Sequence, residues 1–292
     1  MFRSGLFYIF SVFLIKISKN INKYNLYNFI KVPDYQIHLI PLLSDNYSFI
    51  FKCNDTDITA CIDPADGEGV ELFLQSHHMK LDFILNTHHH YDHIAGNKYL
   101  KNSYDCKIIG YIDDKHRIPS VDLTVKNNDI VKIGNHNFQI MYIPGHTSGH
   151  ICYFNNIAKI LFIGDTLFSS GCGRIFEGTY QQMYDSLELL KKLPSDTKIY
   201  CAHEYSLNNI EFALTLEPTN QDLLNKQQKC KKLRDNNKPT IPSTLADELK
   251  TNPFLRTLSP ELRNSINKTS DAYNIDVFTQ IRKMKDRFVT ES

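Results

Sequence analysis

The pattern of apolar and polar positions divides the chain into two parts near residue 205. Residues 35–52 alternate apolar and polar side chains and then become continuously apolar, which predicts two opening strands. Shorter apolar runs predict further strands at 58–67, 81–88, 106–111, 129–143, 150–154, 159–166 and 198–203. The pair Gly134-Asn135 is typical of a hairpin turn, so the 129–143 run is expected to fold back on itself.

Helical periodicity appears in two places among these strands and then dominates the rest of the chain. Residues 69–78 and 180–193 place their apolar side chains on one face, which predicts two helices. Beyond the strands, helices are predicted at 207–216, 220–236 and 276–288. We therefore expect a strand-rich domain over residues 34–205 and a helical domain over residues 206–292.

Composition and charge narrow the class of protein. Hydrophobic residues make up 42% and charged residues 22% of the 292 residues, which is typical of a globular protein with a real core. The formal net charge of +1 and the lack of a basic stripe argue against a nucleic-acid partner. The seven cysteines are scattered and form no C-x-x-C pair, which argues against a disulfide framework and favours a reducing compartment. Only Cys172 lies near candidate chemistry.

Residues 1–33 differ in kind from the rest of the chain. They contain no Asp or Glu, and an apolar run from Leu6 to Ile15 is followed by a basic tail. The run is shorter than the roughly 20 residues of a membrane span but has the length of a signal-peptide core. We predict a targeting leader, similar to the two-part leaders of proteins sent to a secondary plastid. A membrane anchor or a disordered extension on a cytoplasmic protein is the alternative; after leader removal no stable membrane association is expected.

Residues 87–93 read THHHYDH and continue directly from a predicted buried strand. Clustered imidazole nitrogens and a carboxylate suit a borderline metal ion such as zinc. Three other predicted strands end in residues of the same kind, namely His146, Asp165 and His203. Each has a simpler explanation by itself, since Asp165 could cap a turn and His203 could be a buried core histidine. Four strand ends that present such ligands in one chain predict a metal site.

The motifs THHHYDH, PGHTSGH, GDTLF and HEY, in this order, resemble those of the metallo-β-lactamase superfamily. The longer segments GDTLFSSGCGRIFEGT and STLADELKTNPFLR resemble more closely its glyoxalase II branch, the hydroxyacylglutathione hydrolases. The resemblance extends from Tyr35 to Phe288 and does not include the leader. It implies an α/β fold, an αββα metallo-β-lactamase sandwich followed by a C-terminal helical domain.

The resemblance also implies a site for two divalent metal ions. The first ion would be held by His88, His90 and His146, and the second by Asp92, His93 and His203. Asp165 would bridge the two, and both Asp92 and Asp165 would be catalytic. Zinc is the first expectation, with iron or manganese as alternatives, because nitrogen and oxygen ligands suit all three. His89 and Tyr91 need not bind metal, whereas His150 and Asp63 are candidates for orienting the ligand imidazoles.

A glyoxalase II hydrolyses S-D-lactoylglutathione, an S-2-hydroxyacylglutathione thioester, to D-lactate and glutathione in the second step of methylglyoxal detoxification. The nucleophile would be a hydroxide shared by the two metals, and the thiolate leaves without strong acid help because its pKa is about 8.5. The residues implied for binding the glutathione thioester are Arg174, Phe176, Tyr205, Arg282 and Lys285. The alternative for the last two is a solvated basic helix face.

Two of these positions depart from the usual residues of the branch. Arg174 stands where a lysine is usual, which keeps the charge and changes the geometry. Phe176 stands where a tyrosine is usual and loses one hydroxyl, a hydrogen bond worth about 0.5–1.5 kcal/mol. We expect altered contact with glutathione and retained activity.

Three other functions compete with this interpretation. A persulfide dioxygenase of the same superfamily would hold one iron, but such proteins lack the long helical tail. A non-catalytic thiol- or metal-binding module would not require the intact ligand set. A nuclease of the superfamily is disfavoured by the near-neutral charge. The oligomeric state is left open.

Overall fold

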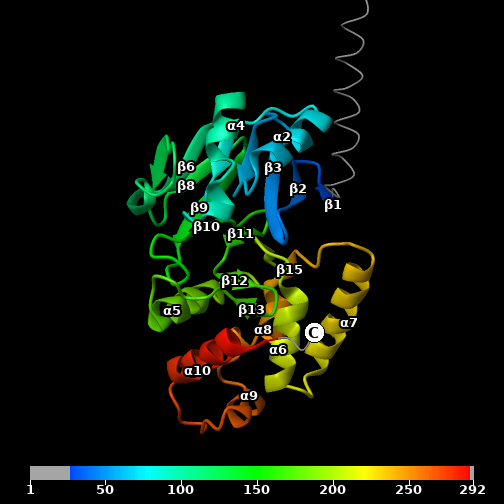
Figure 1. Ribbon diagram of the computed structural model, residues 1–292, viewed down its shortest axis with the longest axis vertical. Helices are drawn as coiled ribbons and strands as arrows, with labels where there is room; N and C mark the ends of the chain where they lie inside the picture. Colours follow the sequence, from blue (N-terminus) through cyan, green and yellow to red (C-terminus); the bar gives the residue numbers. More distant parts are fainter. Residues whose placement is uncertain (1–26, 290–292) are drawn as a thin grey trace, which may run out of the picture.

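The computed structural model describes residues 27–289 and shows a β-sandwich that continues into a helical region (Figure 1). The first sheet has the strand order β1-β2-β3-β4-β5-β6-β7. Its strands are β1 (Tyr27–Lys31), β2 (Tyr35–Leu42), β3 (Asn46–Cys53), β4 (Thr59–Ile62), β5 (Phe83–Leu85), β6 (Lys107–Tyr111) and β7 (Leu123–Val125). Strands β1 to β4 pair antiparallel, and β4 to β7 pair parallel.

The second sheet has the order β15-β14-β11-β10-β9-β8. Its strands are β8 (Ile130–Ile133), β9 (His136–Tyr142), β10 (Ile151–Asn155), β11 (Ile160–Gly164), β14 (Lys198–Cys201) and β15 (Ser243–Thr244). The predicted hairpin joins β8 to β9, and Gly134 supplies the positive φ of +57° that the turn requires. Strands β11 and β14 are parallel, so their carboxyl ends lie at the same edge of the sheet.

Alternation along the strands produces two hydrophobic layers. Phe49 and Phe51 of β3 belong to the core between the sheets, whereas Ile50 belongs to a second core with Val70 and Phe73 of helix α2. Helices therefore cover the outer face of the first sheet. The helices that precede the helical region are α2 (Gly67–Ser76), α3 (Tyr91–Ile94), α4 (Asn97–Tyr104), a 3₁₀ turn η1 (Ile112–Asp114) and α5 (Tyr180–Leu190).

Helix α5 lies on the side of the second sheet. A capping box between Thr179 and Gln182 fixes its first turn. It adds Met183, Leu187 and Leu190 to the core that contains the second sheet. Helix, sheet, sheet and helix thus follow one another, which confirms the predicted αββα sandwich.

The predicted helical region follows the sandwich and lies below it in Figure 1. It comprises α6 (Ser206–Leu216), α7 (Gln221–Asp235), α8 (Leu245–Thr251), a 3₁₀ turn η2 (Pro253–Leu255), α9 (Pro260–Ser265) and α10 (Asn274–Arg287). The small hairpin of β12 (Leu167–Phe168) and β13 (Gly171–Cys172) lies between the sandwich and these helices. Strand β15 pairs with β14, so the helical region also contributes an edge strand to the second sheet.

The described residues begin at Tyr27, inside the predicted leader. Residues 27–31 form β1 and pair with β2, although they were expected within the leader of residues 1–33. Residues 1–26 lie outside the described residues, so targeting to an organelle stays a prediction. Among the helices described over residues 27–289, none has the length and apolar character needed to cross a membrane.

Candidate metal centre and substrate pocket

Four strand ends meet at one edge of the sandwich, as the sequence predicted. The ligand loop, residues 87–93, follows β5, and His146 follows β9. Asp165 directly follows β11, and His203 lies two residues beyond β14. Among the described residues, the groups of side chains close enough to hold a metal ion contain the seven predicted ligands and no other residue.

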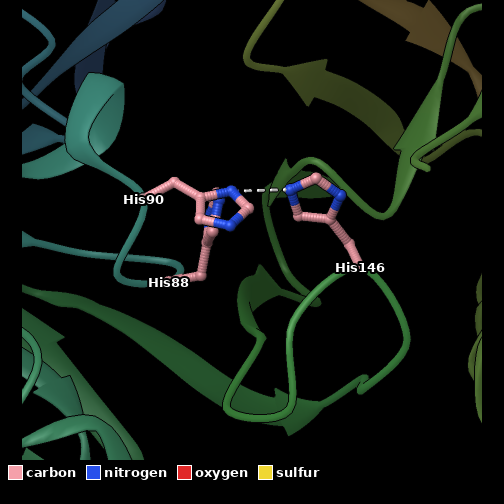
Figure 2. A group of neighbouring side chains, drawn as sticks. All are labelled: His88, His90 and His146. Atoms are coloured by element: carbon pink, nitrogen blue, oxygen red, sulfur yellow. Dashed lines mark hydrogen bonds between the residues drawn. The ribbon is translucent and has the colours of Figure 1, made fainter. Parts of the chain in front are cut away.

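The first group consists of His88, His90 and His146 (Figure 2). The Nε2 atom of His146 lies 3.0 Å from Nδ1 of His90, and Figure 2 shows the two rings facing each other with His88 beside them. One ring nitrogen from each of the three lies within 4.8 Å of the others. Three imidazole nitrogens at such spacing can bind one ion.

The second group consists of Asp92, His93 and His203. Oδ2 of Asp92 lies 3.7 Å from Nε2 of His93 and 3.4 Å from Nε2 of His203. The short helix α3 carries Asp92 and His93 side by side, while β14 brings His203 from more than a hundred residues away. This group offers one carboxylate and two imidazoles to an ion.

Asp165 lies between the two groups. Its Oδ1 is 3.4 Å from Nε2 of His93, and its Oδ2 is 3.4 Å from Nε2 of both His146 and His203. A single carboxylate therefore reaches ligand atoms of both groups. This is the position that a bridging ligand of two ions would occupy.

Unsatisfied buried atoms show that the centre suits metal ions. His88 Nε2, His93 Nε2 and Asp165 Oδ1 are buried and have no hydrogen-bond partner. Buried polar atoms without partners are costly, and those that persist call for an explanation such as an ion. The nitrogen and oxygen atoms left over here are the ligand atoms that zinc, iron or manganese accept.

The two groups differ in their charge state without metal. Burial lowers the pKa of His88 and, with His146, lowers that of His90 to about 4, so the first group is neutral near pH 7. Although burial opposes it, the carboxylates of Asp165 and Asp63 raise the pKa of His93 to about 10. The pKa of His203 is raised in the same way by Asp165. The second group therefore holds protons that an ion would displace.

Asp63, which the sequence suggested as an orienting residue, touches a ligand ring. Its Oδ2 lies 3.0 Å from Nδ1 of His93 and accepts a hydrogen bond from Oγ1 of Thr87 at 2.7 Å. His150, the other suggested residue, stacks on His88 and accepts the backbone N–H of Asp165 at its Nε2. It therefore holds the main chain of Asp165 in place, and its Nε2 contacts no ligand nitrogen.

Two supporting residues were missed. Oδ1 of Asp45 lies 2.7 Å from Nδ1 of His203, and Nδ2 of Asn46 donates to Oδ2 of Asp92 at 2.9 Å. Asp45 lies in the turn between β2 and β3, and Asn46 is the first residue of β3; the sequence SDNY was interpreted only as part of a strand pair. The signal was present as three consecutive polar residues, Ser44 to Asn46, inside a mainly apolar segment.

Backbone freedom at Gly164 brings two strand ends together. Its φ is +56°, and a Cβ there would lie 2.4 Å from Oγ1 of Thr87. Thr87 immediately precedes the first ligand of the loop, and Gly164 immediately precedes Asp165. Only glycine allows this close approach without displacing one of the two loops.

A cavity of about 770 Å³ opens from the metal centre and reaches the helical region. Its lining includes His90, Asp92, His146, Asp165 and His203 at one end. All five residues predicted to bind the substrate line it too, namely Arg174, Phe176, Tyr205, Arg282 and Lys285. The cavity joins the candidate metal centre to fixed positive charge, as an anionic substrate would require.

The two basic residues of α10 are held differently. Arg282 is only 4% exposed, and its guanidinium donates to the carbonyl of Cys172 at 2.8 Å and pairs with Asp286 at 2.9 Å. Lys285 donates to the backbone and side-chain oxygens of Asn208. Burial, and then the charge of Arg282, lowers the pKa of Lys285 to about 8. Arg282 is buried and Lys285 is half-buried, so the two residues do not form the fully solvated basic helix face that was the alternative for them.

The aromatic residues of the pocket lie against the ligands. The ring of Tyr205 stacks on His203 with centroids 4.8 Å apart. Phe176 is 61% exposed and presents its ring at right angles to His90 and His146. Arg174 is largely exposed, 3.6 Å from Asp286. The pocket thus has an aromatic rim next to the metal centre.

The other cysteines and histidines stay outside the centre. All seven cysteines lie within residues 27–289, are buried and form no disulfide, as predicted. Cys172 alone among them lines the cavity just described. The histidines interpreted as surface or core residues belong to none of the metal-binding groups: His38, His77, His78, His116 and His136.

Two family descriptions divide this chain between them. Residues 46–203 match the metallo-beta-lactamase superfamily, and residues 204–288 match the hydroxyacylglutathione hydrolase C-terminus. Among solved structures, a BLEG-1 B3 metallo-beta-lactamase has a TM-score of 0.59 at 20% identity and covers 75% of this chain and 99% of its own. ETHE1 from Myxococcus xanthus has a TM-score of 0.57 at 22% identity and covers 88% and 97%. At these identities the similarity shows the fold alone.

Relatives that are more than 40% identical to this chain include two bacterial hydroxyacylglutathione hydrolases. A hydroxyacylglutathione hydrolase of Rhodospirillum rubrum is 44% identical over 252 residues, which cover 86% of this chain and 98% of that protein. One of Methylococcus capsulatus is 42% identical over 253 residues, covering 87% and 98%. The similarity spans both the sandwich and the helical region. The chain therefore belongs to the hydroxyacylglutathione hydrolase (glyoxalase II) family of the metallo-β-lactamase superfamily.

Proposed function

We propose that this enzyme hydrolyses S-2-hydroxyacylglutathione thioesters, with S-D-lactoylglutathione as the preferred substrate, at a centre that holds two divalent ions. Zinc is the first candidate for both. The observation that carries the proposal is the position of Asp165. Its carboxylate lies within 3.4 Å of ligand nitrogens of both groups, at the inner end of a cavity lined by Arg282 and Lys285.

His88, His90 and His146 would hold one ion, Asp92, His93 and His203 the other, and Asp165 both. When bound, two such ions supply a water of near-neutral pKa and stabilise negative charge on a carbonyl oxygen. The neutral first group offers its nitrogens directly, and the supporting carboxylates of Asp63 and Asp45 face the Nδ1 atoms of His93 and His203. The Nε2 atoms of those two rings are thereby directed at the centre.

The departure of the thiolate requires no acid catalyst from the protein. A glutathione thiolate leaves readily because its conjugate acid has a pKa of about 8.5, so no residue needs to donate a proton to it. This agrees with the composition of the pocket, where the groups near the ligands are the rings of Phe176 and Tyr205. These rings also displace water next to the scissile bond.

Glutathione carries two carboxylates, and the basic end of the pocket faces them in this proposal. Lys285 is the most direct candidate, because its ammonium is held by neutral oxygens of Asn208 and forms no ion pair with a carboxylate among residues 27–289. Arg174 adds a second, exposed charge at the rim. Arg282 pairs with Asp286 and contributes chiefly by fixing α10 against β13.

Turnover and metal content of the full chain test this function together. We expect hydrolysis of S-D-lactoylglutathione with two ions per chain, loss of turnover with a chelator, and recovery when zinc, iron or manganese is returned. Free thiol released by hydrolysis and elemental analysis are the measurements. Oxygen consumption with glutathione persulfide would instead support the dioxygenase. Fully metal-loaded protein without thioester turnover would contradict the proposal.

Replacing Lys285 by alanine is expected to raise KM about tenfold and to leave kcat within about twofold, because the ammonium binds the substrate away from the reacting carbonyl. The matched control is Lys283→Ala, which removes an exposed charge from the same helix. The Lys283 ammonium lies over the ring of Tyr180, outside the substrate pocket. Steady-state kinetics of both variants decide the point. An unchanged KM in the Lys285 variant would remove this residue from the substrate site.

A further inference from the structure

One of the four histidines of the ligand loop, His89, belongs to no metal-binding group. It lies between His88 and His90, and its ring faces two carboxylates from other parts of the chain. Its Nδ1 is 3.3 Å from Oδ2 of Asp114, and its Nε2 is 3.2 Å from Oε1 of Glu177. The chain thus places a ring with two polar contacts between two ligands.

Arg117 joins these two carboxylates. Its guanidinium donates through Nε and Nη2 to Oδ1 of Asp114 and through Nη1 to Glu177 at 2.7 Å. The same group donates to Oγ of Ser148 at 2.9 Å. Asp114 is fully buried, so this arginine compensates a charge that has no access to water. Arg117, Asp114 and Glu177 therefore form a partly buried network and not an ion pair at the solvated surface.

Glu177 extends the network to the two loops beside the centre. It accepts hydrogen bonds from the backbone N–H and the hydroxyl of Ser148, two residues after the ligand His146. Although burial opposes it, these bonds and the contact with Arg117 lower the pKa of Glu177 to about 2, so the residue is ionised at neutral pH.

Glu177 also belongs to the segment that carries the pocket rim. Residues 174–178, here called the rim loop, include Arg174 and Phe176. Two backbone bonds seat this loop on the loop of His146: Phe176 N–H donates to the His146 carbonyl, and Gly178 N–H donates to the Gly145 carbonyl, both at 3.1 Å. The ligand loop, the His146 loop and the rim loop therefore converge on one charged network.

We infer that His89, Asp114, Arg117 and Glu177 form a positioning network. The network fixes the rim loop, and with it Arg174 and Phe176, in the position over the metal ligands that substrate binding requires. None of the four touches the reacting atoms. They act through the rim loop on substrate binding. The inference rests on the proposed function, because it assigns the network to binding of the glutathione thioester.

Arg117→Ala in the full chain is the first test. We expect KM to rise about tenfold while kcat changes less than about twofold and both metal ions are retained, because the rim loop contacts the substrate away from the reacting bond. Arg117→Lys should recover part of the loss, since it keeps the charge but not the forked geometry. The control is Lys115→Ala, which removes an exposed charge from the same turn.

A double-mutant cycle shows whether the network acts through the rim loop. Arg174→Ala raises KM by itself if Arg174 binds the substrate. In that background, Arg117→Ala should raise KM by less than it does in the native chain, because only Phe176 is left of the two pocket residues that it positions. Fully additive effects of the two substitutions on KM would overturn the inference.

His89 is tested by two conservative variants. His89→Asn keeps a polar group near the position of Nδ1 and the contact with Asp114, whereas His89→Gln keeps one near Nε2 and the contact with Glu177. We expect His89→Gln to stay closer to the native KM, since Glu177 is the link to the rim loop. Loss of a metal ion in the Arg117 variant, or an unchanged KM, would overturn the inference. Native enzyme that binds two ions and hydrolyses the thioester shows separately that the proposed function holds.

Discussion

Asp165→Ala is expected to remove metal and activity together, with turnover lower by at least about a hundredfold. Changing only the outer partners of metal ligands costs about 10–100-fold, and Asp165 reaches ligand nitrogens of both groups directly. Without its carboxylate, His93 and His203 also lose one of the negative charges that they face. Elemental analysis and thioester turnover on the same preparation measure the two losses.

The control for this prediction is Asp196→Ala, an exposed aspartate in the turn before β14. It should keep two ions per chain and the native rate. Circular dichroism of the Asp165 variant should match the native spectrum, because Asp165 lies outside β11 and the pairing of that strand remains. Two bound ions with a normal rate in that variant would show that Asp165 does not bridge them.

Asp63→Asn is expected to empty the second group selectively, leaving about one ion per chain and about 10–100-fold less turnover. The backbone N–H of Thr87 donates to Oδ1 of Asp63, so the amide oxygen of an asparagine would turn toward it. The amide NH₂ would then face Nδ1 of His93, which must accept and carry its proton on Nε2 instead. A protonated Nε2 cannot bind an ion.

A matched control exists for this substitution because the exposed residue Asp57 shares the backbone conformation of Asp63. Asp63 has φ +49° and Asp57 has φ +58°, and asparagine tolerates both. Asp57 is exposed and pairs with Lys52, so Asp57→Asn should leave metal content and rate unchanged. If Asp63→Asn retained two ions and full turnover, the orientation of His93 would not depend on this carboxylate.

A metal site could be predicted from the chain because the ligand loop and three further candidate ligands each follow a recognisable apolar run, whereas the set of seven ligands was implied by the family resemblance. His146 follows β9, Asp165 follows β11, and His203 follows β14, and in each case a turn comes next. The carboxyl ends of parallel strands lie at the same edge of a sheet, and β11 and β14 are parallel neighbours, which brings Asp165 and His203 together. The basic pair on α10 was predicted on its helical spacing and its resemblance.

The partners of these residues could not be predicted in the same way. Asp45 reaches His203 across 158 positions, and Arg282 reaches the carbonyl of Cys172 across 110. Such contacts depend on the register of several strands and on how α10 lies against β13. A polar residue at a turn gives no sign of which distant ring it will face.

The amino-acid sequence by itself determined the order of strands and helices, the identity of the residues that could bind metal, and the positions of the basic residues on α10. These properties follow from local periodicity and from side-chain chemistry, which need no knowledge of distant neighbours. Only the tertiary structure decided that Asp165 lies between two groups, that Arg282 donates to the carbonyl of Cys172, and that His89 faces Asp114 and Glu177. The physical reason is that each of these relations requires segments far apart in the chain to be fixed against one another by the packed cores of the sandwich.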